Sequence, residues 1–353
     1  MVKAFVYQSQ ASRVAFGPGA LASLANELDA LGIAKALVLT TPEQVALGQR
    51  VATLLGERCA GVFGGAVMHV PIEAAVEARA VAARLGADGC VAVGGGSTLG
   101  LAKAIALTSS LPIVAVPTTY AGSEMTPIYG LTDAGVKKTG RDLRVLPRSV
   151  VYDPELTLTL PVALSITSGM NAIAHAAEGL YAHDGNPIMG LMAEEAIRAL
   201  ADALPRVQQS PQDIDARSDA LYGAWLAGSV LGNVAMGLHH KLCHTLGGSF
   251  NLPHADVHTV VLPHALAYNA AAAPQAMQRI ARALGADDAP RAMQALARRL
   301  GAPVSLRAIG MPEAGLDRVA ELAVQTPYPN PRPLERGALR ALLQRAFEGA
   351  EPA

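Results

Sequence analysis

The sequence predicts an α/β domain with a parallel sheet, followed by an all-helical domain. Short runs of aliphatic and β-branched residues alternate with helical patterns in the first half of the chain, which is the order of βαβ units. Beyond Pro161, helical patterns follow one another with few strand-like runs between them. We therefore predict two domains, at residues 1–156 and 157–353.

The composition favours a closely packed protein that binds neither nucleic acid nor membranes. Of its 353 residues, 51% are hydrophobic and 16% are charged, and the net charge is -1 without a block of basic residues. Its apolar runs are far shorter than the ~20 residues of a membrane helix, so we expect no transmembrane segment. Three scattered cysteines and an N-terminus without a secretory pattern favour a reducing cytoplasm.

Strands and helices alternate along the predicted first domain. Its strands are expected at residues 2–7, 13–16, 35–40, 60–67, 89–93, 112–116 and 150–152, and its helices at residues 20–31, 71–85 and 99–107. The first two strands would form a hairpin that could pair across a two-fold axis, so we expect a homodimer. Residues 131–148 are polar and contain several Lys and Arg, which is typical of a solvated hairpin but would also suit a cationic contact with a nucleotide or an acidic substrate.

The predicted second domain is a series of helices. They are expected at residues 162–182, 188–204, 216–237, 238–246, 260–272, 276–284, 290–300, 316–324 and 335–348.

A glycine-rich turn follows the strand at residues 89–93. It reads Gly94-Gly95-Gly96-Ser97, and a helical pattern begins directly after it. Glycines at such a turn let backbone N–H groups approach a phosphate, and the positive end of the helix favours the anion. A second loop of small hydroxyl residues, PTTYAGSE, follows the next strand. The pair of loops favours a pyrophosphate site over an ordinary tight turn, because ligands of open sheets bind at the ends of the strands.

Histidines gather in the stretch LHHKLCHTLGGSFNLPHADVH, from 238 to 258. His240 and His244 are four residues apart and would project from one face of a helix, which the glycines at 247 and 248 would end so that His254 could turn back towards them. Asn171 and His175 form another i, i+4 pair. These groups could surround one cation or one substrate carbonyl.

The motif series resembles that of the iron-type, group III alcohol dehydrogenases. It consists of GGGSTLGLAK, PTTYAGSE, VVYDPELT, SGMNAIAHAAEGL, HHKLCHTLGGSFNLPH and YPNPRP, in this order over nearly the whole chain. The resemblance implies a Rossmann-like dinucleotide-binding domain joined to a helical domain, an architecture shared with dehydroquinate synthase. It also implies a divalent-metal site whose ligand positions here are Asn171, His175, His240 and His254, with His244 near the nicotinamide.

Two residues depart from the pattern of that family. Asn171 replaces the family's Asp ligand, and Gly100 replaces the Asp of GGGSxxD. A neutral amide holds a divalent cation less well than a carboxylate does, so we expect no metal. Asn171, together with VMHVPIEAAVEA, LTDAGVKKTGRD and HHKLCHTLGG, is similar to a subgroup of the family, the maleylacetate reductases of aromatic-compound degradation.

The resemblance to this subgroup implies NAD(P)H-dependent reduction of a C=C bond conjugated to a ketone, which gives 3-oxoadipate. Hydride addition leaves an enolate that a His could stabilise without a metal. We expect His244 or His254 to be the oxyanion partner or proton donor and His175 and His240 to shape the pocket. The substrate is a small dicarboxylate, and the candidates for holding its carboxylates are Lys241, Arg332 and Asn171.

The resemblance also implies the residues that hold the cofactor. They are Gly95, Gly96 and Ser97 for the pyrophosphate, Thr118, Thr119, Ser123 and Thr126 along the ribose path, and Lys137 or Lys138 against the nucleotide. Thr41 stands where family members that prefer NADH often carry Asp. Without that carboxylate a 2′-phosphate is not repelled, so we expect NADPH to be accepted beside NADH.

Two other functions are compatible with the resemblance. One is a metal-dependent alcohol dehydrogenase in which Asn171 is a weak ligand, and the other is a lyase like dehydroquinate synthase. The sequence also leaves two interpretations of Cys243, a small buried residue or a thiolate promoted by a neighbouring His.

Overall fold

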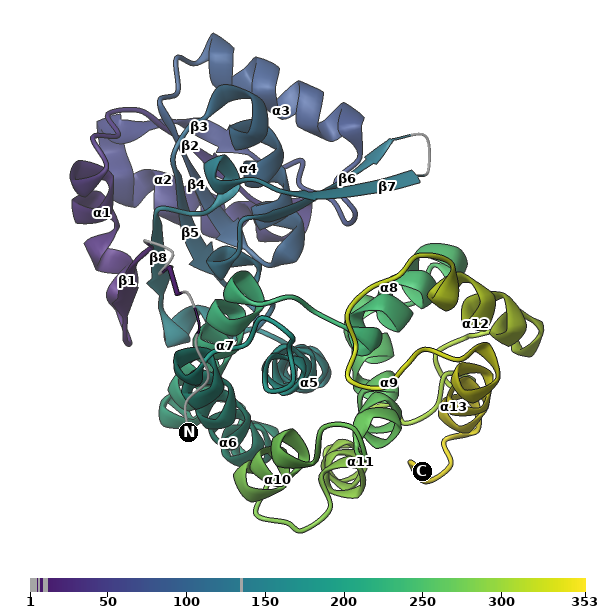
Figure 1. Ribbon diagram of the computed structural model, residues 1–353. Helices are drawn as coiled ribbons and strands as arrows, with labels where there is room; N and C mark the ends of the chain where they lie inside the picture. The colour runs from purple at the N-terminus through teal and green to yellow at the C-terminus, as the bar shows by residue number, and fades with distance from the viewer. Residues whose placement is uncertain (1–4, 6, 9–11, 134–135) are drawn as a thin grey trace. The chain divides into compact units, whose positions relative to one another are not determined.

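The computed structural model describes residues 5, 7–8, 12–133 and 136–353 (Figure 1). The chain divides into two compact units, Ser9–Leu160 and a unit that contains Pro161–Ala353. The division follows the short 3-10 helix Pro154–Thr157, whose N-cap Asp153 ends the last strand of the first unit.

The first unit is built on a six-stranded sheet in which every pair of neighbours is parallel, as predicted. Its order is β1-β8-β5-β4-β2-β3. The strands are β1 (Arg13–Phe16), β2 (Ala36–Leu39), β3 (Cys59–Phe63), β4 (Gly89–Gly94), β5 (Ile113–Pro117) and β8 (Ser149–Tyr152). The central strands β2, β4 and β5 are fully buried, because helices cover such a sheet on both faces.

Four helices connect the strands of this unit. They are α1 (Leu24–Ala30), α2 (Val45–Leu55), α3 (Ile72–Arg84) and α4 (Gly96–Ser109). Side chains of α1 and α2 form one core cluster with the valines of the central strands, and α4 packs against β4 and against α3.

The expected N-terminal hairpin falls mostly outside the described residues. Its second strand, β1, pairs with β8 in parallel, with Arg13 opposite Ser149. Glu27 joins the two strands from the neighbouring helix, because its carboxylate accepts hydrogen bonds from Arg13 Nε (2.8 Å) and Ser149 Oγ (2.6 Å). β1 therefore lies at an edge of the parallel sheet.

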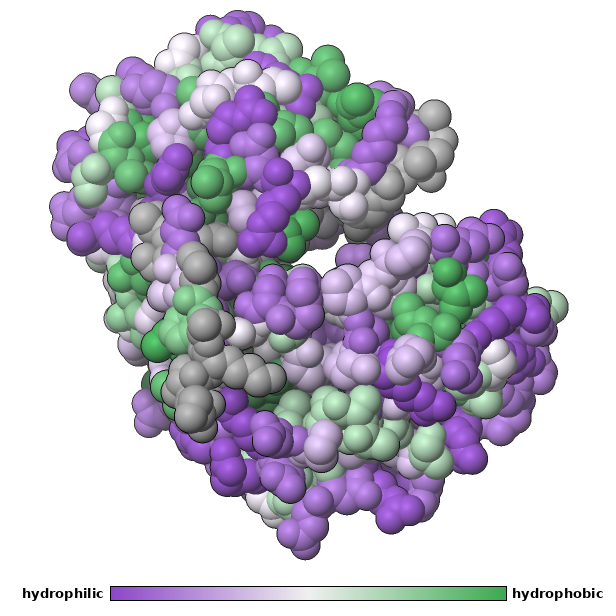
Figure 2. Space-filling view, in the orientation of Figure 1, coloured by the Kyte–Doolittle hydropathy of each residue, from purple (hydrophilic) through white to green (hydrophobic). Residues whose placement is uncertain are grey.

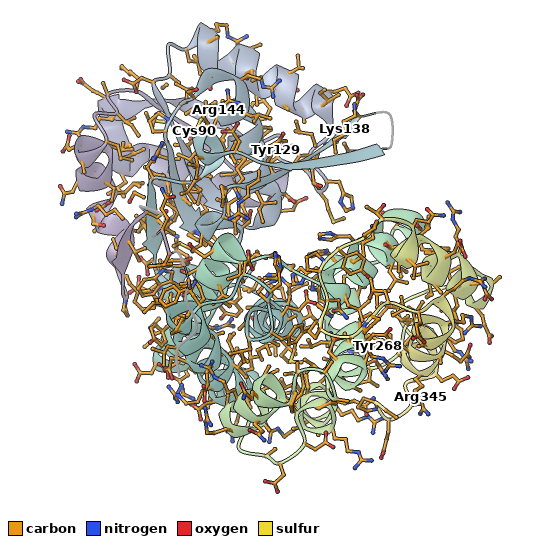
Figure 3. All side chains as sticks on the ribbon, viewed as in Figure 1. Cys90, Tyr129, Lys138, Arg144, Tyr268 and Arg345 are labelled. Carbon is orange, nitrogen blue, oxygen red and sulfur yellow. The ribbon has the colours of Figure 1, made fainter. Side chains whose placement is uncertain are left out.

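The polar segment after the second loop forms an antiparallel hairpin. Its strands are β6 (Ile128–Asp133) and β7 (Val136–Arg141). Lys138 Nζ lies 2.9 Å from Asp133 Oδ2, and both side chains are exposed. Figures 2 and 3 show hydrophilic side chains along this hairpin, with Lys138 near its tip. The hairpin is therefore present with exposed cations, and their contact with a nucleotide or an acidic substrate stays a prediction.

The described residues of the second unit form helices joined by loops, without a strand. Its helices are α5 (Val162–Gly179), α6 (Pro187–Gln209), α7 (Ile214–Asn233), α8 (Leu238–Phe250), α9 (His254–Asn269), α10 (Pro274–Ala283), α11 (Ala289–Arg299), α12 (Leu316–Gln325) and α13 (Arg336–Glu348). α5 is almost entirely buried against α6, α7 and α9, and a second core joins α8, α9, α12 and α13. Within the described ranges no single helix has the length and hydropathy of a membrane span, and only the pair α7 and α8, bent by 96°, meets these criteria when taken together.

The structure corrects the predicted helix ends around the histidines. α8 does not stop before the glycine pair but continues to Phe250, and Asn251, with a φ of 51°, ends it in the left-handed conformation. Phe250 packs against the core of this unit, which outweighs the cost of two glycines in a helix. α9 begins at His254, directly after Pro253, and ends at Asn269, so its predicted range of 260–272 was wrong at both ends.

Candidate active site

The first part of the site is the turn between β4 and α4. Gly94 has a φ of 151°, and a Cβ there would lie 2.5 Å from Thr98 Oγ1, so a side chain is excluded. Gly95 is the N-cap of α4 and supplies no side-chain cap, which leaves the first N–H groups of the helix without an intrahelical partner. This is the arrangement that binds an anion at a helix N-terminus.

The second loop lies beside this turn. Thr118 N donates to Gly94 O (3.2 Å), and Thr119 lies 3.0 Å from the position of a Cβ on Gly95. Thr118 Oγ1 accepts a hydrogen bond from Gln44 Nε2 (3.0 Å). The structure thus brings the glycine turn and the threonine loop together.

Two hydroxyl groups near the turn have no partner among the described residues. Thr98 Oγ1 and Thr40 Oγ1 are buried and form no hydrogen bond there. Thr41 follows at the end of β2, half-buried, as the N-cap of the 3-10 helix Pro42–Gln44. Of these three threonines, Thr40 and Thr98 are fully buried, and the half-buried Thr41 is the one that a ligand can reach.

The remaining predicted cofactor residues have protein partners or cannot be described. Ser123 and Thr126 face the buried amine of Lys103, whose Nζ lies 3.2 Å and 2.9 Å from their hydroxyl oxygens. Lys138 pairs with Asp133. The side chain of Lys137 lies outside the described part of the chain.

The second part of the site is in the helical unit and starts on α5. Asn171, His175 and Glu178 occupy positions i, i+4 and i+7, so all three project from one face of this buried helix. α8 presents His240 and His244 at i and i+4, and α9 presents His254 and His258 in the same way.

A chain of hydrogen bonds runs from Glu178 to Asn171. Glu178 Oε2 lies 2.6 Å from His240 Nδ1, His240 Nε2 lies 2.8 Å from His175 Nδ1, and His175 Nε2 lies 3.2 Å from Asn171 Nδ2. The carboxylate can only accept, so His240 Nδ1 carries a proton. If both rings are neutral, His240 Nε2 then accepts from His175 Nδ1, and His175 Nε2 is left as an acceptor. Asn171 Nδ2 then donates to His175, and its buried Oδ1 has no partner among the described residues.

Glu178 also caps α8. Its carboxylate accepts from the backbone N–H groups of Gly237 (3.0 Å), His239 (2.9 Å) and His240 (3.3 Å). α8 has no side-chain cap from its own N-cap residue, so a carboxylate on α5 satisfies the start of this helix. Burial raises the pKa of Glu178, but the hydrogen bonds that its carboxylate accepts from the His240 ring and from the His239 backbone more than offset it and lower the pKa to about 2.

Two further histidines form a neutral buried pair beside this chain of hydrogen bonds. His239 Nε2 and His258 Nδ1 are 2.9 Å apart and both side chains are fully buried. Burial lowers the pKa of His239 to about 3 and lowers that of His258 well below its usual value. Cys243 packs against His239, and burial raises the pKa of its thiol, so the structure favours the small buried residue over the reactive thiolate.

The other two histidines are exposed on the surface of the helical unit. His244 and His254 have stacked rings with centroids 6.2 Å apart. Each is four residues from a buried partner, His240 or His258, so this pair lies one helical turn beyond the buried group. A substrate can reach His244 and His254 directly.

The predicted carboxylate-binding cations differ in their surroundings. Lys241 is half-buried, with Nζ 5.9 Å from the centre of the Tyr328 ring. Arg332 stacks on Tyr268 of α9, labelled in Figure 3, with Cζ 4.2 Å from the ring centre, and Nη1 contacts the Tyr268 carbonyl. Arg332 is therefore engaged with Tyr268, which agrees with a structural role for this residue.

Two of the metal ligands that the resemblance implies, His175 and His240, contact each other in this structure. The 2.8 Å contact between His175 and His240 is a hydrogen bond, in which one nitrogen carries a proton and the other uses its lone pair. Two nitrogens held by one tetrahedral Zn²⁺ at 2.0–2.1 Å would be about 3.3 Å apart. Possible ligand atoms of His239, Cys243 and His258 also lie within 4.8 Å of one another. However, His239 Nε2 and His258 Nδ1 share a hydrogen bond, and the raised pKa of the Cys243 thiol keeps it protonated.

A cavity of about 590 Å³ opens at the other end of α5. It is lined by Glu178, Tyr181, Gly237 and the segment around Asn330, and by His183 as its one histidine. Because the exposed His244 and His254 do not line it, we do not assign the reaction to this cavity.

Both parts of the chain match one family. The model of iron-containing alcohol dehydrogenases matches residues 11–154, and that of the C-terminal part of the Fe-containing alcohol dehydrogenase family matches residues 165–347. The chain belongs to the iron-containing alcohol dehydrogenase family.

Maleylacetate reductases are among its relatives, and the similarity extends along their whole length. The chain is 66% identical to the maleylacetate reductase of Burkholderia cepacia over 99% of this chain and 100% of that protein, and 59% identical to that of Pseudomonas knackmussii over 99% of each. The crystal structure of maleylacetate reductase from Agrobacterium tumefaciens superposes with a TM-score of 0.97 at 53% identity, covering 99% of this chain and 100% of that one.

Sequence reasoning missed two buried charged residues, Glu178 and Lys103. Glu178 is seven residues after Asn171, so the helical period that paired Asn171 with His175 also placed it on the same face. Lys103 is the last residue of GGGSTLGLAK and lies in an otherwise apolar helix, where a lone lysine is a signal for buried contacts.

Proposed function

We propose that this protein is an NAD(P)H-dependent reductase that converts maleylacetate into 3-oxoadipate. The observation that carries the proposal is the full-length similarity to maleylacetate reductases, combined with Asn171 at the end of a hydrogen-bonded histidine chain. Family membership alone would equally suit an alcohol dehydrogenase, so the substrate assignment depends on these two features.

A nicotinamide cofactor suits the residues of the first unit and would supply hydride to the alkene carbon. The N–H groups of Gly96 and Ser97 would hold its pyrophosphate, and the hydroxyls of Thr118 and Thr119 would lie along the ribose path. Thr41 carries no charge, so NADPH as well as NADH would be accepted.

The residues of the helical unit would stabilise the enolate and return a proton. His244 and His254 are reachable from solvent, and a protonated imidazole at either position would neutralise a developing oxyanion and then donate its proton to carbon. Glu178 and His240 hold His175 and Asn171 in place, which keeps the buried part of the pocket uncharged apart from the Glu178 carboxylate. Lys241 is the remaining candidate to meet a substrate carboxylate.

The test is a spectrophotometric assay of purified protein with NADH and NADPH. Maleylacetate should be reduced rapidly with one nicotinamide oxidised per alkene, while simple alcohols and aldehydes should react at least 100-fold more slowly, a difference of roughly 3 kcal/mol in transition-state binding. Dialysis against EDTA should leave the rate unchanged. Faster turnover of an aldehyde than of maleylacetate would refute the proposal.

The second candidate is a metal-dependent alcohol dehydrogenase, favoured by the ligand positions that His175, His240 and His254 share with the family. It requires stoichiometric Fe or Zn in the purified enzyme and loss of activity on chelation. Metal analysis beside the same assay separates the two functions.

Two further properties are proposed on the sequence. A homodimer, formed through the edge of the sheet at β1, predicts twice the monomer mass in light scattering, and a monomer mass would contradict it. A cytoplasmic location predicts that all three cysteines are free in protein labelled inside intact cells.

A further inference from the structure

Lys103 lies inside the first unit with its amine surrounded by oxygens. The side chain is fully buried, and Nζ contacts Ser123 O (2.7 Å), Thr126 O (2.8 Å) and Ile128 O (2.8 Å). The hydroxyl oxygens of Ser123 and Thr126 complete the group at 3.2 Å and 2.9 Å. All five oxygens belong to one segment, 123–128, which continues the threonine loop.

This shell resembles the surroundings of a metal cation more than those of an ordinary lysine. An ammonium has three protons, so it can contact five oxygens only if some of its hydrogen bonds are shared between two acceptors. The attraction between its charge and the carbonyl dipoles adds to these hydrogen bonds. The segment contains the short 3-10 helix Ser123–Met125, which begins at Gly122 with a φ of 78°. Without a central cation, three carbonyl oxygens would point at one another in an apolar interior.

A buried carboxylate accompanies the amine. Glu124 is fully buried and its Oε1 accepts a hydrogen bond from Tyr152 Oη at 2.8 Å. Burial lowers the pKa of Lys103 to about 7, and the charge of Glu124 opposes that shift. Burial likewise raises the pKa of Glu124. The charge of each group opposes the pKa shift that burial causes in the other, and the Tyr152 hydrogen bond connects Glu124 to β8.

We propose that Lys103 is a positioning residue for the dinucleotide, an internal cation that holds segment 118–128 in its cofactor-binding conformation. The inference rests on the proposed nicotinamide cofactor. Thr118 and Thr119, which meet the glycine turn, precede the segment that the amine anchors. Loss of the charge would let the loop move, and the glycine turn would lose its neighbour.

The test compares Lys103→Met with Ile105→Ala on the same helix. Methionine is unbranched and only one atom shorter than lysine, and it removes the charge, whereas Ile105 is buried on α4 and has no part in the oxygen shell. Binding of NADH is measured by calorimetry without substrate, and the KM for NADH and for maleylacetate is measured separately. Thermal unfolding is recorded for both variants.

Lys103→Met should weaken NADH binding roughly tenfold or more and leave the KM for maleylacetate near its wild-type value. Ile105→Ala should lower the melting temperature and leave both constants unchanged. Unchanged NADH affinity in Lys103→Met, or an equal loss in Ile105→Ala, would overturn the proposal. Calorimetry needs no turnover, so the two proposals can fail separately. If NADH binding depends on Lys103 but the protein does not reduce maleylacetate, the result contradicts the proposed function only.

Lys103→Gln covers the case in which the methionine variant does not fold. Its amide donates two hydrogen bonds without a charge, so NADH affinity should fall between those of the wild type and Lys103→Met. Failure of both variants to fold would show that the amine serves the fold as a whole, which would also overturn the proposal.

Discussion

At the scale of single residues, Asn171 is the position where this site departs from the metal site that the family resemblance implies. Its amide donates to His175 and so continues a hydrogen-bond chain in which each ring needs only one proton. A carboxylate at this position could not donate. His175 would then need a second proton or a cation as its neighbour.

Asn171→Asp should therefore gain affinity for Zn²⁺, by on the order of tenfold or more, and lose reductase activity with maleylacetate. The added charge repels both the dicarboxylate and the enolate. Zn²⁺ titration and steady-state kinetics are the measurements. Asn233→Asp, near the end of α7, is the matched control and should change neither. Wild-type Zn²⁺ affinity in Asn171→Asp would contradict the assignment of this position.

Glu178 connects residue chemistry with stability. Glu178→Gln should lower the free energy of unfolding by roughly 2–4 kcal/mol, because the new amide N–H₂ meets N–H donors at the start of α8. Activity should fall with it, since His240 loses the group that orients its ring. Glu195→Gln is the control. Its partner Arg198 is exposed, and such a pair contributes less than about 1 kcal/mol.

The same variant predicts a pH dependence. The pKa of Glu178 is lowered from 4.5 to about 2 in the folded protein, so its stabilising contribution is complete above about pH 4.5 and is lost as the pH falls towards 2. The difference in melting temperature between wild type and Glu178→Gln should stay constant from pH 5 to pH 8 and shrink below pH 4.5. A difference that grows on acidification would contradict the charged state of Glu178.

At the scale of elements, the sequence predicted where chemistry gathers better than where helices end. Glycines usually stop a helix, yet Gly247 and Gly248 lie inside α8 because Phe250 beyond them has a core to join. No local pattern contains that tertiary contact. The pairing of β1 with β8 could not be predicted from the sequence either, because Arg13 and Ser149 are far apart in it. Glu27, whose carboxylate contacts both residues, belongs to neither strand.

Gly248 and Gly94 predict opposite responses to the same substitution. Gly248→Ala should stabilise α8 by about 0.5–1 kcal/mol, because the new methyl meets nothing within 4 Å and alanine favours a helix. Gly94→Ala should destabilise the first unit and weaken NADH binding, since its φ and the 2.5 Å approach to Thr98 exclude a Cβ. Thermal unfolding and NADH titration of both variants measure this. Equal effects of the two substitutions would contradict the distinct roles assigned to them.

At the scale of the whole molecule, the two units have separate cores, and we propose separate tasks for them. The parallel sheet and the helical half follow from alternation and periodicity. The structure brings together Gly95 with Thr119 and His175 with His240, which were selected from their spacing and from a family resemblance, and their roles stay predictions. The buried charged residues Lys103 and Glu178 were not predicted, because their partners are mainly backbone groups. A sequence does not show which N–H groups or carbonyls a side chain will contact.

This division of tasks predicts where ligands protect the backbone from hydrogen exchange. NADH alone should slow exchange first at residues 94–98 and 118–126, because bound phosphate and ribose cover N–H groups that the protein leaves unpaired. Maleylacetate alone should slow exchange in the middle of α8 and at the start of α9, next to His244 and His254. Mass spectrometry of peptic peptides resolves these segments, and α13, whose surface is largely hydrophilic in Figure 2, is the internal control. Protection of α8 by NADH with none at 94–98 would place the nucleotide on the wrong unit and refute the assignment, whereas protection confined to the predicted segments would support each ligand's site independently of catalysis.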